Sequence, residues 1–142
     1  MAVASGPIQR PAETSVPKTA NKEEVTAELD TVRLAPDDRV FDQDRSISTF
    51  YIVRQGLLGI FRHVYPDKRV LVHKIGPSES TGLAEAMDAH PFPGQLIPIK
   101  ETVAYRGTQG DIDNLCEKFP TAVHRLLAHE NQMHAATLHR ID

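Results

Sequence analysis

Residues 48–64, STFYIVRQGLLGIFRHV, contain the pattern that decides the fold. β-branched and aromatic side chains dominate the stretch, and Gly56 and Gly59 interrupt it, which is typical of short strands separated by a turn. Residues 66–68, Pro-Asp-Lys, follow with the chemistry of a hairpin turn. Residues 69–75, RVLVHKI, then alternate between polar and apolar side chains. This stretch therefore predicts consecutive antiparallel strands joined by short turns.

Further short strands are predicted on both sides of this stretch. Upstream, residues 31–35 alternate, a turn follows at residues 36–38, and residues 39–41 begin a second extended segment. Downstream, residues 95–100 and 102–106 are two more candidate strands. Short strands at close spacing with turn punctuation predict an antiparallel sandwich or barrel.

The last third of the chain has helical patterns. Residues 111–119 begin with acidic side chains, as the helix dipole prefers, and stop before Pro120. Residues 121–142 contain neither glycine nor proline and predict a long helix. Its apolar side chains recur mainly three and four positions apart and form one broad stripe, made of Val123, Leu126, Leu127, Met133, Leu138 and Ile141. The predicted fold class is mainly β with flanking helices.

The domain boundaries follow from composition. Residues 1–27 contain three prolines and only scattered large apolar groups, so we predict a disordered tail with a helical turn near residues 23–29. That tail could be an unstructured segment in solvent, or it could be a docking peptide that becomes ordered when it binds a partner. Residues 28–142 form the predicted domain, with a β-roll over about 31–108 and helices over about 111–142.

Composition excludes several functional classes. The 142 residues favour one domain, and the net charge of −3 gives no reason to expect nucleic acid or an anionic membrane as a direct partner. A single cysteine, Cys116, excludes an internal disulfide framework. We find neither a secretory signal nor an apolar run long enough to span a membrane. We therefore expect a cytoplasmic protein without membrane insertion.

Five stretches occur in a familiar order: residues 33–46 (RLAPDDRVFDQDRS), 50–63 (FYIVRQGLLGIFRH), 68–80 (KRVLVHKIGPSES), 82–87 (GLAEAM) and 102–129 (TVAYRGTQGDIDNLCEKFPTAVHRLLAH). Together they resemble the cyclic-nucleotide-binding domain of the catabolite-activator (Crp/Fnr-like) and ion-channel superfamily. The resemblance implies a double-stranded β-helix, or jelly-roll barrel, followed by a long C-terminal helix.

The resemblance also exposes departures in the phosphate-binding cassette. Gly82 stands at the cassette's entry, but Leu83 replaces the family's ribose-binding glutamate, and Phe92 and Pro93 fall near its phosphate-binding arginine and the small residue after it. Glu85 is a poor substitute for the family's glutamate. It lies two positions after Leu83, and a residue two positions further along a helix points to the opposite side of that helix. Residues 80–100 contain no arginine. Backbone N–H groups at the short helix could still attract an anion, but we expect no binding of cyclic AMP or cyclic GMP in the family manner.

The favoured hypothesis is a non-catalytic regulatory module that acts as a small subunit or adaptor of a larger assembly. The chain stops at Asp142, where transcription factors of the family continue into a helix-turn-helix domain, so we expect no direct contact with nucleic acid. The C-terminal helix could form a homodimer or make other contacts. For Phe92 there are two possibilities: its ring contacts a partner, or it folds inward and fills the pocket that binds the nucleotide in the family. The predicted partner contacts are Pro91, Phe92, Pro93, Leu127 and Met133.

Two alternatives stay open. The chain could sense a different small ligand inside the barrel, bound by a polar side chain such as Arg54, Arg62 or His73. It could also be the sensor domain of a transcription regulator without its helix-turn-helix, acting by mixed dimerisation with a full-length relative. The sequence shows no conspicuous heptad that would favour the second alternative.

Catalysis, metals and cofactors are not expected. Histidines recur every five residues in the last helix (His124, His129, His134 and His139), a step that scatters the rings around the axis. Glu130 and His134 have a suitable spacing, but two ligands do not make a site. A haem could take an axial ligand from His63, His73 or Cys116, and nothing marks any of them. We interpret Cys116 as a buried, inert thiol.

Overall fold

The two glycines of residues 48–64 have different roles in the structure, a computed structural model that describes residues 24–88 and 90–141, with side chains described to residue 132. Gly56 has a φ of 109° and joins strand β2 (Thr49–Gln55) to strand β3 (Leu58–Val64). A Cβ at this position would lie 2.6 Å from the Thr102 Cα, so only glycine can make the turn. Gly59, by contrast, lies inside β3 and interrupts nothing.

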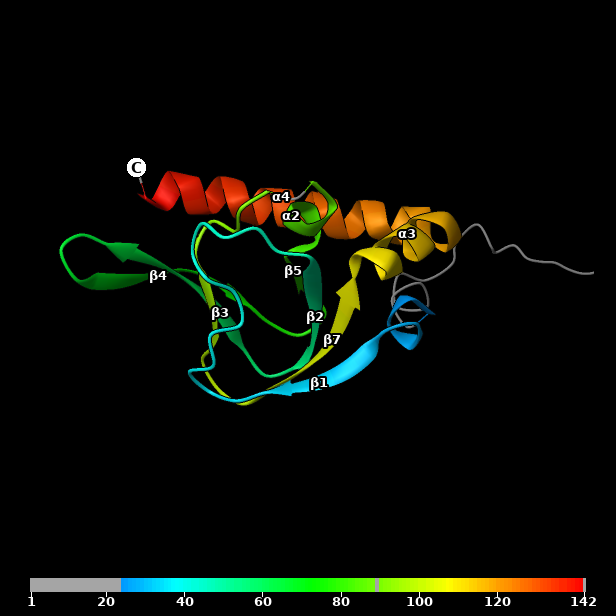
Figure 1. The fold of residues 1–142 in the computed structure, drawn as a ribbon, viewed down its shortest axis with the longest axis horizontal. Helices are drawn as coiled ribbons and strands as arrows, with labels where there is room; N and C mark the ends of the chain where they lie inside the picture. Colours follow the sequence, from blue (N-terminus) through cyan, green and yellow to red (C-terminus); the bar gives the residue numbers. More distant parts are fainter. Residues whose placement is uncertain (1–23, 89, 142) are drawn as a thin grey trace, which may run out of the picture.

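The strands form two antiparallel sheets (Figure 1). One has the order β1-β7-β2-β5, with β1 (Asp30–Leu34), β7 (Thr102–Thr108) and β5 (Ser80–Thr81). The other has the order β4-β3-β6, with β4 (Lys68–Ile75) and β6 (Gln95–Pro98). The predicted jelly-roll class is confirmed, but the sheets do not close into a continuous barrel. Outside these strands, isolated antiparallel β-bridges pair Phe41 with Leu96 and Ser46 with Pro91.

Strand β2 separates two hydrophobic cores. Tyr51 and Val53 belong to the core between the two sheets, whereas Phe50 and Ile52 belong to the core under the helices. Successive side chains of a strand point to opposite faces, so a strand covered on both faces becomes apolar throughout. This double burial explains why β2 shows a continuous apolar run.

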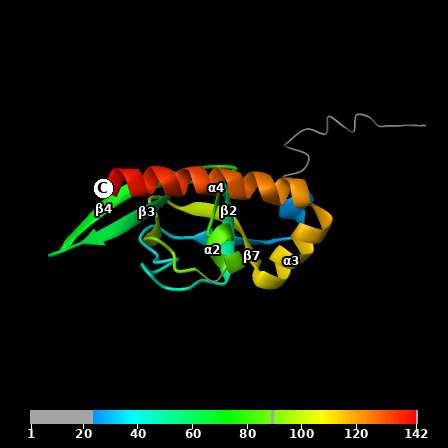
Figure 2. The same ribbon diagram turned by 90° about the horizontal axis from the view of Figure 1, so that it is seen from above.

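Three helices lie on one side of the first sheet (Figures 1 and 2): α2 (Leu83–Asp88), α3 (Gln109–Lys118) and α4 (Pro120–Ile141). Helix α3 begins before the predicted residue 111, because Thr108 and Asp111 form a reciprocal capping box. Helix α4 starts with Pro120 in its first turn, where proline is tolerated. It packs along α2 and reaches β4. No helix in the described part of the chain is long and apolar enough to cross a membrane.

The folded part of the chain starts earlier than the predicted boundary at residue 28. Residues 24–27 are helical, and Val25 is completely buried in the core under the helices, together with Leu29. Glu28 lies 3.5 Å from the Lys118 ammonium of α3. The helix at residues 24–27 lies within the helical turn expected near residues 23–29, and it is packed on the domain because Val25 is buried in the core. The rest of the predicted tail lies outside the described residues.

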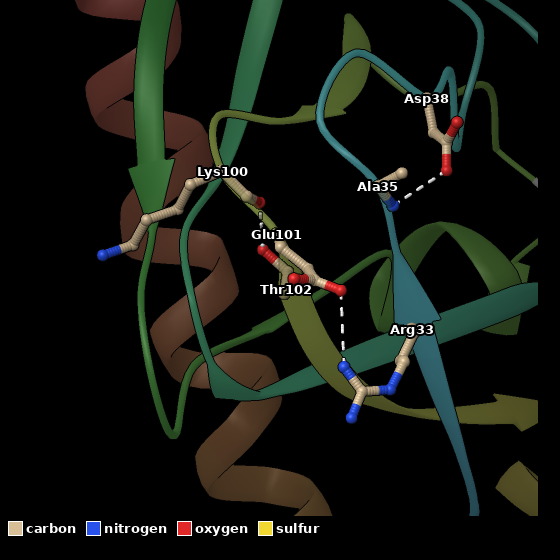
Figure 3. A network of polar contacts seen from close by, with 6 residues as sticks. All are labelled: Arg33, Ala35, Asp38, Lys100, Glu101 and Thr102. Atoms are coloured by element: carbon tan, nitrogen blue, oxygen red, sulfur yellow. Dashed lines mark hydrogen bonds and ion pairs between the residues drawn. The ribbon is translucent and has the colours of Figure 1, made fainter.

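A polar network holds the turn between β6 and β7 against β1 (Figure 3). The Thr102 hydroxyl donates to the Lys100 carbonyl at 2.9 Å and accepts from the Leu57 N–H at 3.1 Å. Arg33 of β1 pairs with Glu101 at 3.3 Å. These contacts fix the turn opposite Gly56, at the end of the molecule away from α2.

Candidate functional site

The entry to the cassette is closed by an aromatic ring. Gly82 has a φ of 87°, and a Cβ there would lie 2.8 Å from Cε2 of Phe41 and 3.1 Å from Cδ1 of Ile47. The positive φ and the close approach both require glycine. The backbone at the start of α2 therefore packs directly on side chains of the core.

Leu83, which stands in place of the family's glutamate, is buried in the core under the helices. Glu85 and Ala86 are buried too, so α2 is enclosed on more than one side. Helix geometry predicts that Glu85 and Leu83 point to opposite sides of α2. In the structure both side chains are nevertheless buried, which the sequence did not predict. Leu83 contributes packing and offers no polar group to a ligand.

Phe92 lies in the interior between the sheets and has no exposed surface. Its ring centroid is 4.8 Å from that of Phe41, which lies 5.5 Å from that of Tyr51. The Phe92 N–H donates to the Arg45 carbonyl, and its carbonyl accepts from the Asp44 N–H, both at 2.9 Å. The prediction of Phe92 as a surface contact was therefore wrong, and the inward alternative is correct. Full burial of the ring explains the outcome, since it removes a large apolar surface from water.

The other predicted contact residues are placed differently. Pro91 is exposed and bridges to Ser46, while Pro93 is half-buried and its carbonyl accepts a hydrogen bond from Arg62. Leu127 is partly buried and packs on the core under the helices. The side chain of Met133 lies outside the described residues. Among the members of this set whose side chains the structure describes, Pro91 is the exposed one.

Glu130 of α4 directs its carboxyl group at the start of α2. One carboxylate oxygen accepts from the Ser80 hydroxyl at 2.6 Å and from the Leu83 N–H at 3.2 Å, and the other accepts from the Ala84 N–H at 3.1 Å. The side chain has no exposed surface. Amide groups in the first turn of a helix lack partners within the helix. A carboxylate from the same chain therefore satisfies the donors that an external anion would use.

The neighbouring carboxyl group of Glu85 is also buried. Burial raises the pKa of Glu85, and a hydrogen bond to its own backbone and the charge of His90 oppose the rise. Burial likewise raises the pKa of Glu130, and the negative charge of Glu85 adds to the effect, while the bonds from Ser80, Ala84 and Leu83 oppose it. Two buried carboxyl groups thus influence each other electrostatically, and the hydrogen bonds from Leu83 and Ala84 place Glu130 at the start of α2.

A second contact joins α4 to the turn before β5. His129 Nε2 lies 2.9 Å from one carboxylate oxygen of Glu79, whose other oxygen accepts from the Gly76 N–H at 2.6 Å. His129 and Glu130 are adjacent on α4, as Glu79 and Ser80 are on the facing segment. The long helix is therefore fastened to this segment at two successive positions.

The sequence prediction missed Glu130, although a signal was present. Glu130 lies four positions after Leu126 and seven after Val123, in the middle of the apolar stripe of α4. A carboxylate on a buried helix face needs hydrogen-bond donors or a counter-charge. That argument predicts a polar partner for Glu130 but not its identity, because the donors lie about fifty positions earlier in the chain.

The remaining candidate groups do not converge on a site. His63 faces Arg69 across the β3–β4 ladder and His73 faces Ile60, so the two histidines do not face each other in the ladder. Cys116 is partly buried on α3, Arg54 is exposed, and Arg62 is engaged by the Pro93 carbonyl. Within the described part of the chain, no group of three or more metal-ligating side chains is found.

Comparison with known proteins identifies the fold family. The model of the cyclic nucleotide-binding domain matches residues 31–119. No curated protein matches the sequence. The N-terminal domain of a transcriptional regulator from Streptomyces coelicolor A3(2) is similar over 93% of this chain and 88% of its own, at 20% identity and a TM-score of 0.65. The catabolite activator protein of Thermus thermophilus is similar over 92% of this chain, at 17% identity and a TM-score of 0.72, and this chain spans 61% of its length.

A cyclic nucleotide-binding-like protein from Brucella abortus bv. 1 str. 9-941 is similar over 74% of this chain and 88% of its own, at 20% identity and a TM-score of 0.59. Similarity at these identities extends to the fold alone. The family match, however, covers well over half of the residues. With its jelly-roll sheets, its cassette segment and its long last helix, the chain belongs to the family of cyclic nucleotide-binding domains.

Proposed function

We propose that this chain is a non-catalytic regulatory and protein-interaction module that does not bind cyclic AMP or cyclic GMP in the manner of its family. The observation that carries the proposal is the Glu130 carboxylate on the Ser80, Leu83 and Ala84 donors. The interior next to the cassette is filled at the same time by Phe41 and Phe92. The polar and the apolar parts of the old site are both occupied by the protein itself.

A cyclic phosphate would meet two obstacles at this site. It would have to displace Glu130 and leave that carboxylate without its three hydrogen bonds, a loss of roughly 1.5–3 kcal/mol for each bond to a charged group. It would also lack a positively charged partner, since residues 80–100 contain no arginine. Without that partner, we expect the affinity to fall by about one to two decades or more.

Thermal unfolding with and without millimolar cyclic AMP or cyclic GMP tests the loss of binding. We expect no change in Tm, while a cyclic-nucleotide-binding domain of known affinity run alongside should shift by several degrees. A ligand at a hundredfold excess over its Kd adds about 2.7 kcal/mol to the free energy of unfolding. A concentration-dependent rise in Tm with either nucleotide would overturn this part of the proposal.

The tip of the β3–β4 hairpin is the partner surface that we propose in place of Phe92. The hairpin extends beyond the rest of the sheets (Figure 1) and carries exposed apolar side chains at Val64, Tyr65 and Val70. Tyr65 is 90% exposed, an unusual position for a large aromatic ring. Lys68 and Arg69 are exposed beside it. Asp67 is exposed there as well. An aromatic anchor with a rim of charged side chains of both signs has the composition of a protein-binding surface.

Size-exclusion chromatography of the chain from its native source, at its natural expression level, tests the adaptor role. We expect the chain to elute in a complex, and the complex to be lost with Tyr65→Ser. Ile99→Ser is the matched control, because Ile99 is an exposed apolar residue away from the hairpin tip. Elution as a lone monomer, or a complex that tolerates Tyr65→Ser, would contradict the proposal.

A further inference from the structure

The outer edge of β4 is open near the tip of the β3–β4 hairpin. β4 is the end strand of its sheet, so in the described part of the chain it has a strand neighbour only on the β3 side. Helix α4 packs against β4, but Lys68, Arg69 and Val70 are exposed, whereas Ile75 at the other end is buried. The tip extends past the C-terminal end of α4 in both views (Figures 1 and 2). The edge is therefore accessible at its first residues.

The first four residues of β4, from Lys68 to Leu71, pair with β3 in continuous register. Successive side chains of a strand point to opposite faces, so Lys68 and Val70 lie on one face, and Arg69 and Leu71 lie on the other. The Arg69 guanidinium carbon lies 5.2 Å from the centre of the Phe61 ring, which positions it on this second face. Each face thus offers one basic and one apolar side chain beside the open edge.

Charge is unevenly distributed along the chain. Residues 58–75, which form the hairpin, contain four lysines and arginines and one aspartate, a net charge of +3 with the histidines neutral. The whole chain carries −3, so the rest of it carries −6. A negatively charged partner is therefore attracted to the hairpin more strongly than to the remaining surface.

We propose that the open edge of β4 binds an extended acidic segment of a partner protein, which adds to the sheet as a further strand. This binding mode rests on the proposed interaction role of the hairpin and specifies the chemistry of the partner. An edge strand presents a row of N–H and C=O groups, and another extended polypeptide supplies acceptors and donors to both. Lipid headgroups and phosphates offer acceptors but no matching row of donors.

The side chains beside the edge define the sequence that fits it. The described strand pairs of this fold are antiparallel, and we expect the added strand to follow the same arrangement. Running antiparallel to β4, the segment places two apolar residues opposite Leu71 and Val70 and then two acidic residues opposite Arg69 and Lys68. The expected pattern is thus two apolar residues followed by two acidic ones.

A second copy of the chain fits this edge poorly. If the β4 edges of two copies paired at their exposed residues, the Lys68 and Arg69 side chains of both copies would lie within a few residues of one another. Like charges across a ladder repel, and lysine on an edge strand is a common protection against self-pairing. The charges that oppose a second copy attract an acidic strand.

An NMR titration of the isotopically labelled chain with the peptide Thr-Thr-Val-Val-Glu-Glu-Thr-Thr tests the inference. In low-salt buffer we expect saturable shifts centred on Lys68–Leu71, and Lys68→Glu should weaken binding roughly three- to tenfold, because an attraction becomes a repulsion. Arg125→Glu, at an exposed position in the first half of α4, makes the same change in net charge and should leave the affinity unchanged. No binding at millimolar peptide, or equal effects of the two substitutions, would overturn the inference.

Methylation of the peptide backbone tests strand addition itself. Alternate residues of a strand direct their N–H groups to the same side, so methylating the odd or the even residues removes the donors of one side only. One methylated peptide should bind like the parent peptide, and the other should not bind. Equal affinities of the two would mean that side chains alone hold the peptide and would contradict strand addition.

Two other occupants are tested with the same variants. Binding to vesicles of phosphatidylserine and phosphatidylcholine in equal parts, weakened by Lys68→Glu and without binding of the peptide, would assign the hairpin to a membrane surface and overturn the inference. A concentration-dependent dimer that excludes the peptide, measured by sedimentation equilibrium, would assign the edge to a second copy and overturn it too.

Failure of strand addition is distinguishable from failure of the proposed function. If the peptide does not bind but the native complex still depends on Tyr65, strand addition is wrong and the interaction role stands. If the peptide binds as expected but the chain elutes alone from its native source, the edge binds acidic strands and the adaptor role is wrong.

Discussion

Glu130 stabilises the structure through its partners, and its removal has a definite cost. Glu130→Ala leaves the Ser80 hydroxyl and the Leu83 and Ala84 amides without their acceptor in a buried place. We expect a loss of about 2–5 kcal/mol in the free energy of unfolding, the range for breaking a buried polar contact by deleting one partner. Urea denaturation monitored by circular dichroism measures it.

Gln132→Ala provides the reference for Glu130→Ala, since Gln132 lies on the exposed side of the same helix. Exposed substitutions of this kind usually change stability by less than about 0.5 kcal/mol. Equal effects of the two substitutions would mean that Glu130 forms no stabilising contact.

Phe92 allows a second prediction at the residue scale. Phe92→Ala should reduce the free energy of unfolding by about 3–5 kcal/mol, because it opens a cavity beside Phe41 in a fully packed interior. Pro91→Ala, one residue earlier and exposed, should have a small effect in the same urea titration. A near-neutral Phe92→Ala would instead fit a ring that contacts a partner at the surface.

At the scale of elements, the capping box of α3 gives a prediction that does not involve the site. Thr108→Ala removes the hydroxyl that accepts from the Asp111 N–H at 3.3 Å. We expect a loss of about 0.5–2 kcal/mol in thermal or urea unfolding. Thr121→Ala, in the first turn of α4 and exposed, should cost less. A cost for Thr121→Ala equal to that for Thr108→Ala would show that the cap contributes nothing specific.

Most elements could be predicted from sequence because their signals are local. Alternation and turn residues predicted β1, β3 and β4. Acidic residues in the first turn and the following proline predicted α3, and the spacing of apolar residues predicted α4. β5 was missed because two residues carry no periodicity, and its existence depends on pairing with Tyr51 and Ile52. Residues 39–41 were predicted to start a strand, and only a single bridge from Phe41 forms there. Pairing between distant segments decides both cases.

At the scale of the whole molecule, stability should depend on pH through the two buried carboxyl groups. Burial raises the pKa of Glu85 and Glu130 in the folded state. Their contribution is therefore complete below the ordinary glutamate pKa and is lost as the pH rises through the raised values. We expect the urea midpoint to fall over this interval. The double variant Glu85→Gln/Glu130→Gln should flatten the fall, and an unchanged slope in that variant would refute the assignment.

The site was less predictable than the fold, because its residues come from segments that lie far apart in the sequence. Leu83 and Phe92 could be recognised as departures from the family pattern, because each occupies a position in one continuous motif. Whether Phe92 pointed inward depended on the space left by Phe41 and Tyr51, which no local pattern encodes. Glu130 could be predicted to need donors but not to find them at Ser80 and α2.

The separation of Glu130 from its donors also orders the steps of folding. The carboxylate lies 50 positions after Ser80, 47 after Leu83 and 46 after Ala84. Those donors are brought together only when β5 has paired and α2 has formed, so we expect the contact to form late, after the transition state. Glu130→Ala should then accelerate unfolding in stopped-flow measurements and leave the refolding rate nearly unchanged. The carboxylate that fills the cassette would thus set how long the folded chain persists, rather than how quickly it forms.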